Sequence, residues 1–366
     1  MTGIGGVKAG FKFRDADGRD LSGGRSEVKA ETPVAAIGLV VEAVSGEGLA
    51  KVEAVGYRVV HPGAKLDRHQ RITPEVMKDL EEAVVFAPLH DPAVIEVIRE
   101  TMERFPDVAH YACFDTVFHE TMRAAATTYA IPVKYRERGV RRYGFHGLSC
   151  ESIVRQLRDP TLEFPRRMVI AHLGSGCSVT AVVDGRSVDT TMGLTPTGGV
   201  VMGTRPGDLD PGLVIYLLRQ VEGNQVGALE KMLNHDAGMV ALSEMPNDMK
   251  AIREAAARGD AKARLAVQIF TRSVKKAVGG FMALMGGVDA VVFAGGIGEH
   301  DALSRAEILS GLEGFGISMN SERNDAGGDA VRRVNASDSQ TAVYVVPAKE
   351  DWMIAVHVSR MAESAN

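Results

Sequence analysis

Thr195-Pro-Thr-Gly-Gly-Val-Val-Met-Gly-Thr-Arg-Pro-Gly-Asp-Leu-Asp-Pro211 is the stretch that decides how this chain is interpreted. Its glycines and prolines surround one arginine, Arg205, and it ends in Asp210 and Pro211. Asp followed by Pro is typical of an N-cap and a first helical residue, so we expect a helix to begin here. The loop before that helix is too long and too rich in glycine for a tight turn. Either Arg205 binds a carboxylate or phosphate, the anions that a guanidinium captures best, or it pairs with Asp208 or Asp210 on a solvated surface.

Strand-like and helical runs alternate on both sides of this loop, which indicates α/β layers. The predicted strands are 52–60, 110–114, 167–171, 179–183, 187–189, 288–294 and 342–346. The predicted helices are 74–86, 92–104, one from 211, 248–258, 261–285, one from about 301, and 350–361.

Composition excludes several classes of protein. With 366 residues, the chain is long enough for two domains, and 45% hydrophobic with 24% charged residues is ordinary for a globular protein. A net charge of −5 argues against a nucleic-acid or anionic-membrane partner. Three cysteines without CxxC spacing argue against zinc and disulfides. No apolar leader or membrane-length run is present, so we expect a cytoplasmic protein.

Two glycine-rich turns follow predicted strands. The first, 172–178, forms the tip of a predicted hairpin, where exposed backbone N–H groups could cradle a phosphate. The second, 294–300, lies between a buried strand and a helix, which is a position that favours anions. Neither turn matches a Rossmann fingerprint or a P-loop, and glycines also form ordinary turns.

Charged and polar residues also stand at the ends of apolar strands. Such residues are usually paired or catalytic, although a single histidine in apolar surroundings is more often a core residue. The candidates are Arg58, His90, Asp115, His146, His172 and Glu350. The sequence Gly174-Ser175-Gly176 lacks the spacing of a hydrolase nucleophile elbow.

Eight segments, in order along the chain, resemble the acetate kinase family of the actin–hexokinase superfamily. They are GYRVVHPG (56–63), FAPLHDP (86–92), FDTVFHETM (114–122), RRYGFHG (141–147), AHLGSGCS (171–178), TMGLTPTGGVVMGTRPGDLDP (191–211), VVFAGGIGEH (291–300) and KEDWMIA (349–355). The resemblance implies two actin-like (ribonuclease H-like) α/β domains with an active-site cleft between them. It places an N-terminal domain at 1–116 plus 352–366, and a nucleotide-binding and dimerisation domain at 117–351.

The resemblance further implies a phosphotransferase that makes acetyl phosphate from acetate and ATP, reversibly, with Mg²⁺ or Mn²⁺, as a homodimer. Arg58 and Arg205 would flank the acetate carboxylate and the transferred phosphoryl group. Asp115 and Glu350 would lie at the metal, with Asp115 also orienting the nucleophile. His146 would bind the phosphoryl oxygens in the transition state, and His90 and His172 would line the same cleft.

The same resemblance assigns the remaining site residues. Those expected around the acetate methyl group are Val60, Leu89, Phe145 and Pro196. Those expected at the nucleotide are His172, Gly174, Ser175, Gly176, Gly295, Gly296, Ile297 and Gly298. Ser175 stands where the family commonly has asparagine.

One departure concerns the N-terminus. The family's first strand and its Asn-x-Gly-Ser-Ser-Ser-x-Lys phosphate loop are absent, and 10–13 resembles the family's second strand, followed by a hairpin turn at 15–18. Alternatives to an acetate kinase are therefore a propionate or butyrate kinase, a pyrophosphate-using variant, or an impaired, truncated homologue with a structural or regulatory role. Retention of Arg58, Asp115, His146, Arg205 and Glu350 argues against the impaired homologue.

Overall fold

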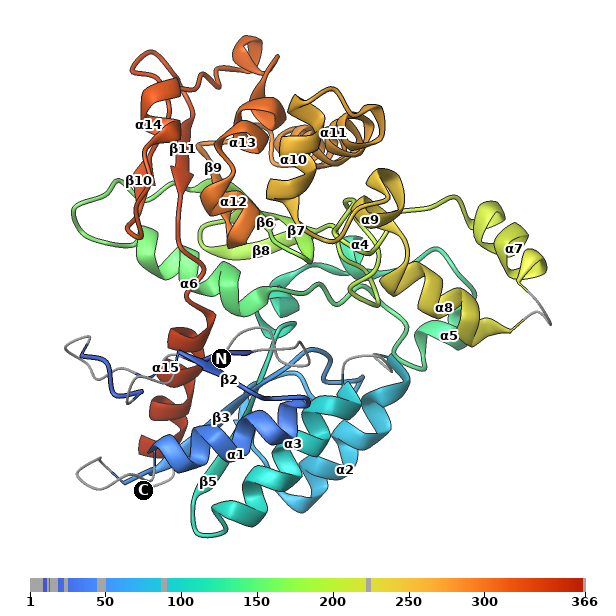
Figure 1. Ribbon diagram of the computed structural model, residues 1–366, viewed down its shortest axis with the longest axis vertical. Coiled ribbons are helices and arrows are strands. Elements are labelled where there is room, and N and C mark those ends of the chain that lie inside the picture. The colour runs from blue at the N-terminus through green and yellow to red at the C-terminus, as the bar shows by residue number, and fades with distance from the viewer. Residues whose placement is uncertain are drawn as a thin grey trace. The chain divides into compact units, whose positions relative to one another are not determined.

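The computed structural model describes residues 9–11, 13, 19–22, 26–44, 51–86, 91–221 and 225–364 (Figure 1). The chain divides into two compact units, Met1–Phe114 with Ile354–Asn366, and Asp115–Met353. The expected domain limits, 1–116 plus 352–366, differ from this division by two residues at each crossing. Of the predicted N-terminal elements, Lys12 and the turn at 15–18 lie outside the described residues.

The first unit is built on a three-stranded sheet in the order β3-β5-β4. Strands β3 (Ala54–Val59) and β5 (Ala109–Phe114) are parallel, and β4 (Gln70–Arg71) pairs with β5 in the antiparallel direction. Helices α1 (Pro33–Val44), α2 (Pro74–Ala83) and α3 (Asp91–Arg104) pack beside one another, and α3 contacts β3. A separate pair consists of β1 (Ala9–Gly10) and β2 (Glu27–Val28).

The second unit contains a six-stranded sheet in the order β10-β11-β9-β6-β7-β8. Its central strands β6 (Arg167–Leu173), β9 (Ala290–Ala294) and β11 (Ala342–Val345) are parallel. The outer strands β7 (Cys177–Val183), β8 (Arg186–Thr190) and β10 (Arg332–Arg333) run antiparallel to their neighbours. Because the central strands are buried on both faces, they are continuous apolar runs, which is why the sequence predicted them.

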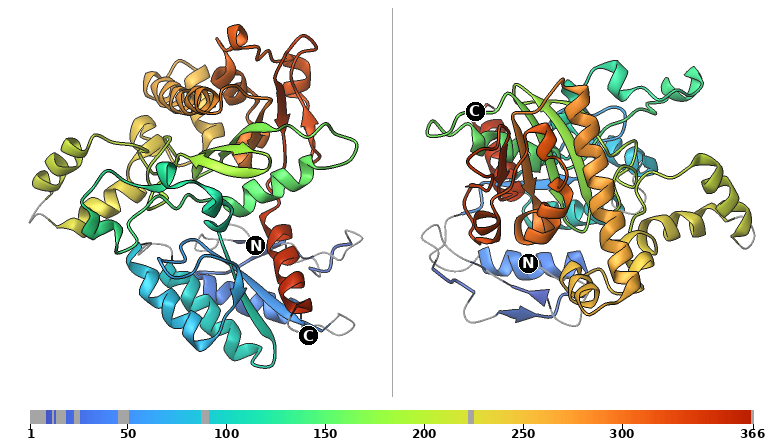
Figure 2. Two further views of the ribbon diagram at one scale, coloured as in Figure 1. Left: turned by 180° about the vertical axis from the view of Figure 1, so that it is seen from behind. Right: turned by 90° about the horizontal axis from the view of Figure 1, so that it is seen from above.

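Helices cover this sheet. Helix α6 (Gly147–Leu157) packs its buried Ile153 and Leu157 against Met168 and Ile170 of β6, and the 24-residue α11 (Ala261–Leu284) packs against β6 and β7 (Figure 2). The remaining helices of the second unit are α4 (Ala124–Thr127), α5 (Val133–Arg136), α7 (Pro211–Gln220), α8 (Val226–His235), α9 (Gly238–Ser243), α10 (Met249–Ala257), α12 (Gly295–His300), α13 (Ala302–Leu309) and α14 (Ser321–Asp325). Helix α15 (Glu350–Glu363) begins in the second unit and ends in the first.

One predicted element differs from the structure. The sequence predicted a turn over the glycines at 295–298 and a helix only from about 301, whereas α12 begins directly at Gly295. Gly295 has a φ of +75°, which lets the chain turn from strand into helix without a connecting loop. Asp301 then ends α12 and caps α13, its carboxylate accepting from Ser304 N at 3.1 Å. Within the described ranges, no helix is long and apolar enough to cross a membrane.

Candidate active site

The predicted hairpin tip is formed by β6 and β7 of the second unit. His172 pairs with Ser178 and Leu173 with Cys177, so the tip is Gly174-Ser175-Gly176, closed by a Gly174 N to Gly176 O hydrogen bond of 3.0 Å. The Ser175 carbonyl accepts from Gly203 N, which ties the tip to the loop that contains Arg205. The Ser175 hydroxyl accepts from the Asn247 amide at 2.8 Å.

The glycine-rich start of α12 lies beside this tip. Strands β6 and β9 are parallel with His172 opposite Ala294, so both glycine segments leave the same edge of the sheet. A Cβ placed on Gly295 would lie 3.2 Å from His172 Nε2, and one placed on Gly174 would lie 4.0 Å from Gly296 N. The two glycine segments predicted separately therefore form one surface.

Two histidines face this surface. The rings of His146 and His172 stack with centroids 4.2 Å apart, and both side chains are buried. His146 Nδ1 lies 2.9 Å from Ser178 Oγ, and His172 Nδ1 lies 2.8 Å from Ser149 Oγ. His146 also has a left-handed backbone (φ 60°, ψ 27°). Such a conformation costs a non-glycine residue on the order of 1–3 kcal/mol and is concentrated at functional sites.

The loop that carries His146 is held by His119. His119 Nε2 donates to the Phe145 carbonyl at 2.9 Å, and Nδ1 faces Ser187 Oγ at 2.9 Å. Burial lowers the pKa of His119 to about 4, so the ring is neutral and can make one donated and one accepted hydrogen bond. Phe145, predicted at the acetate methyl group, is itself 1% exposed.

Arg205 reaches the same tip. Its Nη1 donates to the Pro196 carbonyl at 2.6 Å, and a Cβ on Gly176 would lie 2.9 Å from Arg205 Nη2 and 3.3 Å from His146 Nε2. The solvated-surface alternative is not what the structure shows. Asp208 accepts from Gly199 N, and Asp210 caps α7 at Leu213 N. Burial lowers the pKa of Arg205 because an ionised guanidinium away from water is disfavoured.

The two candidate carboxylates both lie near Cys150 of α6. Asp115 directly follows β5, and its carbonyl accepts from Gly147 N at 2.7 Å. Glu350 is the first residue of α15. Burial raises the pKa of the Cys150 thiol to about 12, and the charges of Glu350 and Asp115 raise it further. Carboxylate oxygens are the ligands that Mg²⁺ prefers, so this donor set fits the expected metal.

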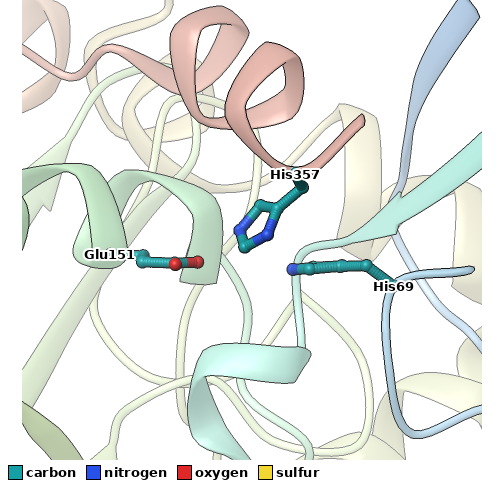
Figure 3. Close-up of side chains that lie close together, drawn as sticks. All are labelled: His69, Glu151 and His357. Carbon is teal, nitrogen blue, oxygen red and sulfur yellow. The ribbon is translucent and has the colours of Figure 1, made fainter. Parts of the chain in front are cut away.

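In the first unit, Arg58 is an exposed residue near the end of β3, opposite Cys113, and Val60 follows that strand. Two histidines support the end of β5. His69 Nδ1 accepts from Phe114 N at 3.0 Å, and its ring lies 4.1 Å from that of His357 (Figure 3). Leu89 and His90 lie outside the described residues.

Comparison with known proteins identifies the family. The sequence model of the acetokinase family matches residues 23–356. This chain belongs to the acetokinase family. An acetate kinase of Shewanella sp. (strain W3-18-1) is 42% identical over 311 residues, which are 84% of this chain and 77% of the relative.

Solved structures of the family share the fold. The acetate kinase of Porphyromonas gingivalis is 31% identical with a TM-score of 0.84, and the match covers 98% of this chain and 91% of that one. A propionate kinase from Francisella tularensis subsp. tularensis SCHU S4 is 35% identical with a TM-score of 0.84, over 92% and 86% of the two chains. The predicted actin-like α/β domains are thereby confirmed.

Several polar residues at the acetokinase site were missed from sequence. They are His119, Ser149, Ser178, Asn247 and Glu299. His119 and Glu299 stand inside segments quoted for the family resemblance, FDTVFHETM and VVFAGGIGEH, and this position was the available signal. The partners of Ser149, Ser178 and Asn247 are 23 to 72 residues away in sequence, so no local pattern marks them.

Proposed function

We propose that this chain is an acetate kinase, which transfers the γ-phosphoryl group of ATP directly to acetate and runs in both directions. The observation that carries the proposal is the convergence of Arg205 and His146 on Gly176, beside the glycine-rich start of α12. A cation, a hydrogen-bond donor and exposed backbone N–H groups suit a polyphosphate better than a neutral substrate.

The reaction demands little covalent chemistry. Acetate is already ionised at neutral pH, so its oxygen attacks the γ-phosphorus without a general base while the bond to ADP breaks. The protein must hold two anions in line and neutralise their charge. This explains why the site offers donors and cations rather than a nucleophile.

Each proposed role follows from the contacts. Ser178 donating to His146 Nδ1 keeps the proton on Nε2, the nitrogen nearest Gly176, which can then donate to a phosphoryl oxygen. Arg205, steered by the Pro196 carbonyl, neutralises the transferred group, and Arg58 is proposed to bind the acetate carboxylate. The residues proposed at the nucleotide are His172, Gly174, Ser175, Gly176, Gly295, Gly296, Ile297 and Gly298.

Asp115 and Glu350 would hold Mg²⁺ or Mn²⁺. When bound, the cation supplies charge neutralisation at the phosphate oxygens. From the family resemblance we further propose a homodimer that works in the cytoplasm.

Substrate length is the open choice within the family. The proposed lining residues Val60, Leu89, Phe145 and Pro196 leave little room beyond two or three carbons. One methylene group changes selectivity by only about 1–3 kcal/mol. We therefore expect propionate to react with a lower kcat/KM than acetate, and butyrate to react less well than either.

The test is a hydroxamate assay of acyl phosphate formation from ATP with acetate, propionate and butyrate. Arg205→Lys should reduce kcat on acetate by about 100-fold or more, because lysine lacks the fork of donors and loss of a preorganised donor costs about 10²–10³ in rate. Arg264→Lys, an exposed arginine that donates to the Gly259 carbonyl, is the matched control and should retain kcat. Butyrate preferred over acetate, or an unimpaired Arg205→Lys variant, would contradict the proposal.

A further inference from the structure

Glu299 joins two segments that the proposed reaction needs. It lies on α12, one turn after Gly295, and its Oε1 accepts from Gly295 N at 2.9 Å and from Ala348 N at 3.0 Å. Gly295 opens the glycine-rich start of α12, and Ala348 lies two residues before Glu350. A single carboxylate oxygen therefore bridges the proposed nucleotide helix and the segment that ends in a proposed metal ligand.

Both bonds satisfy backbone groups that secondary structure leaves over. The first N–H groups of a helix have no partner within that helix, so Gly295 N needs an outside acceptor. Ala348 lies between the end of β11 and the start of α15, in a stretch without strand pairing. An ionised acceptor makes stronger hydrogen bonds than a neutral one, so a carboxylate is an effective bridge.

Helix α6 holds the same segment from another direction. Gln156 Nε2 donates to the Pro347 carbonyl at 2.9 Å, and Ser152 Oγ accepts from Lys349 N at 3.3 Å. Three consecutive residues before Glu350 are thus held by side chains. Among these three side chains, Glu299 is the one that also bonds Gly295.

The other end of α12 is held firmly. Arg305 is 1% exposed, and its Nη1 donates to the carbonyls of Gly298 and Glu299 at 2.9 and 3.0 Å. Asn324 fixes the same guanidinium through its side-chain and backbone oxygens. Because α12 is a short helix held at its C-terminal end, a change at Gly295 is passed to Glu299 rather than absorbed by the helix bending.

We propose that Glu299 is a positioning residue that couples nucleotide binding at the start of α12 to the placement of Glu350. It touches neither substrate nor metal and acts through Gly295 and Ala348. The inference rests on the proposed function for the identity of the nucleotide, whereas the bridge between the two segments stands on the geometry alone.

Hydrogen–deuterium exchange of the ligand-free protein tests the bridge. Glu299→Ala should speed exchange in the peptides covering 295–300 and 346–351 together, by about tenfold, which corresponds to about 1.4 kcal/mol. Glu299→Gln keeps an acceptor oxygen and should give a smaller effect in both peptides. Ser152→Ala should speed only 346–351. Asp289→Asn, which removes a carboxylate bonded to Arg167 at the opposite end of β9, is the control and should change neither.

Exchange with MgADP tests the coupling. In the wild-type protein MgADP should slow both peptides, whereas in Glu299→Ala it should slow 295–300 alone. The KM for ATP and the Mg²⁺ concentration for half-maximal activity should both rise at least fivefold, and the KM for acetate less than twofold.

Two outcomes separate this inference from the proposed function. If MgADP binds to Glu299→Ala and Glu299→Gln and still protects both peptides, the coupling is wrong and the proposed function stands. If calorimetry shows no binding of MgADP to the wild-type protein, the proposed function fails together with the nucleotide part of the coupling.

Discussion

His119 shows how one buried side chain can set the geometry of a site it does not enter. Its Nε2–H donates to the carbonyl of Phe145, the residue before His146, so the neutral ring holds the left-handed turn that presents His146. Protonation would also put a proton on Nδ1 and bring a charge into a fully buried position. The structure therefore depends on His119 staying neutral.

The lowered pKa of His119 predicts how stability depends on pH. The pKa falls from an ordinary value of 6.5 to about 4 on folding because burial disfavours the charged ring. Between pH 6.5 and 4 the unfolded chain binds more protons than the folded one, so this contribution is fully present above pH 6.5 and is lost as pH falls. The expected slope from this residue approaches about 1.4 kcal/mol per pH unit within that window.

Urea unfolding of the wild type and of His119→Gln at pH 7.5, 6.5, 5.5 and 4.5 measures this slope. Glutamine can still donate to the Phe145 carbonyl but does not titrate, so the variant should lose stability less steeply. If the variant fails to fold, the NMR titration of the His119 ring in the wild type gives the same answer. A ring that titrates near 6.5 would contradict the assignment.

At the scale of elements, the β6–β7 hairpin shows why glycine is needed at its tip. Arg205 and His146 approach Gly176 so closely that a methyl group there would lie 2.9 Å from Arg205 Nη2. Contacts under 3.0 Å are essentially never seen for a real Cβ, so one of the side chains must move. The absence of a side chain at Gly176 is what lets a cation and a histidine meet over the tip.

Gly176→Ala should therefore reduce kcat on acetate by about tenfold or more while the protein stays folded. The reason is displacement of a preorganised donor by a fraction of an ångström or more. Gly279→Ala on α11 is the matched control, because nothing lies within 4 Å of its added Cβ. This control should retain kcat and gain about 0.5–1 kcal/mol in unfolding free energy, since alanine favours a helix interior over glycine. Full activity of Gly176→Ala would show that Arg205 need not stay at the tip.

At the scale of the whole molecule, the chain crosses between its two units after Phe114 and after Met353. Two proposed metal ligands lie at these crossings, since Asp115 follows the first and Glu350 precedes the second by three residues. Both belong to the second unit and act on the same Cys150 thiol. Metal binding would thus draw on groups that secondary structure already holds in place.

Removal of divalent cations should abolish activity without unfolding the protein. Chelation with EDTA is expected to leave the Tm of the nucleotide-free protein within about 2 °C, because the fold itself buries the core without an ion. Added Mg²⁺ with ADP should raise the Tm, since a ligand at 100 times its Kd stabilises by about 2.7 kcal/mol. Asp115→Asn should require more Mg²⁺ for activity than the wild type.

Asp184→Asn is the control for that variant, because Asp184 pairs with Arg166 on an exposed surface. It should keep the wild-type Mg²⁺ requirement. Undiminished activity after thorough chelation, or an unchanged Mg²⁺ requirement in Asp115→Asn, would remove these carboxylates from the metal site.

The sequence by itself determined the α/β layers, the family and the segments that meet at the site. Apolar runs such as 288–294 and glycine-rich strand ends are local signals, because buried parallel strands and anion-binding turns demand them of neighbouring residues. The arginine loop left two interpretations open, and the roles of Leu89 and His90 stay predictions because those residues lie outside the described structure.

Only the tertiary structure decided which partners hold those segments in place. Asn247 reaches Ser175 across 72 residues, and Ala348 reaches Glu299 across 49. The helical start at Gly295 was missed for the same kind of reason, since packing against Leu173 and His172 permits it and four neighbouring residues with three glycines do not by themselves predict a helix. Local composition selects what a segment can do, whereas hydrogen bonds between distant residues select which of those possibilities the folded chain adopts.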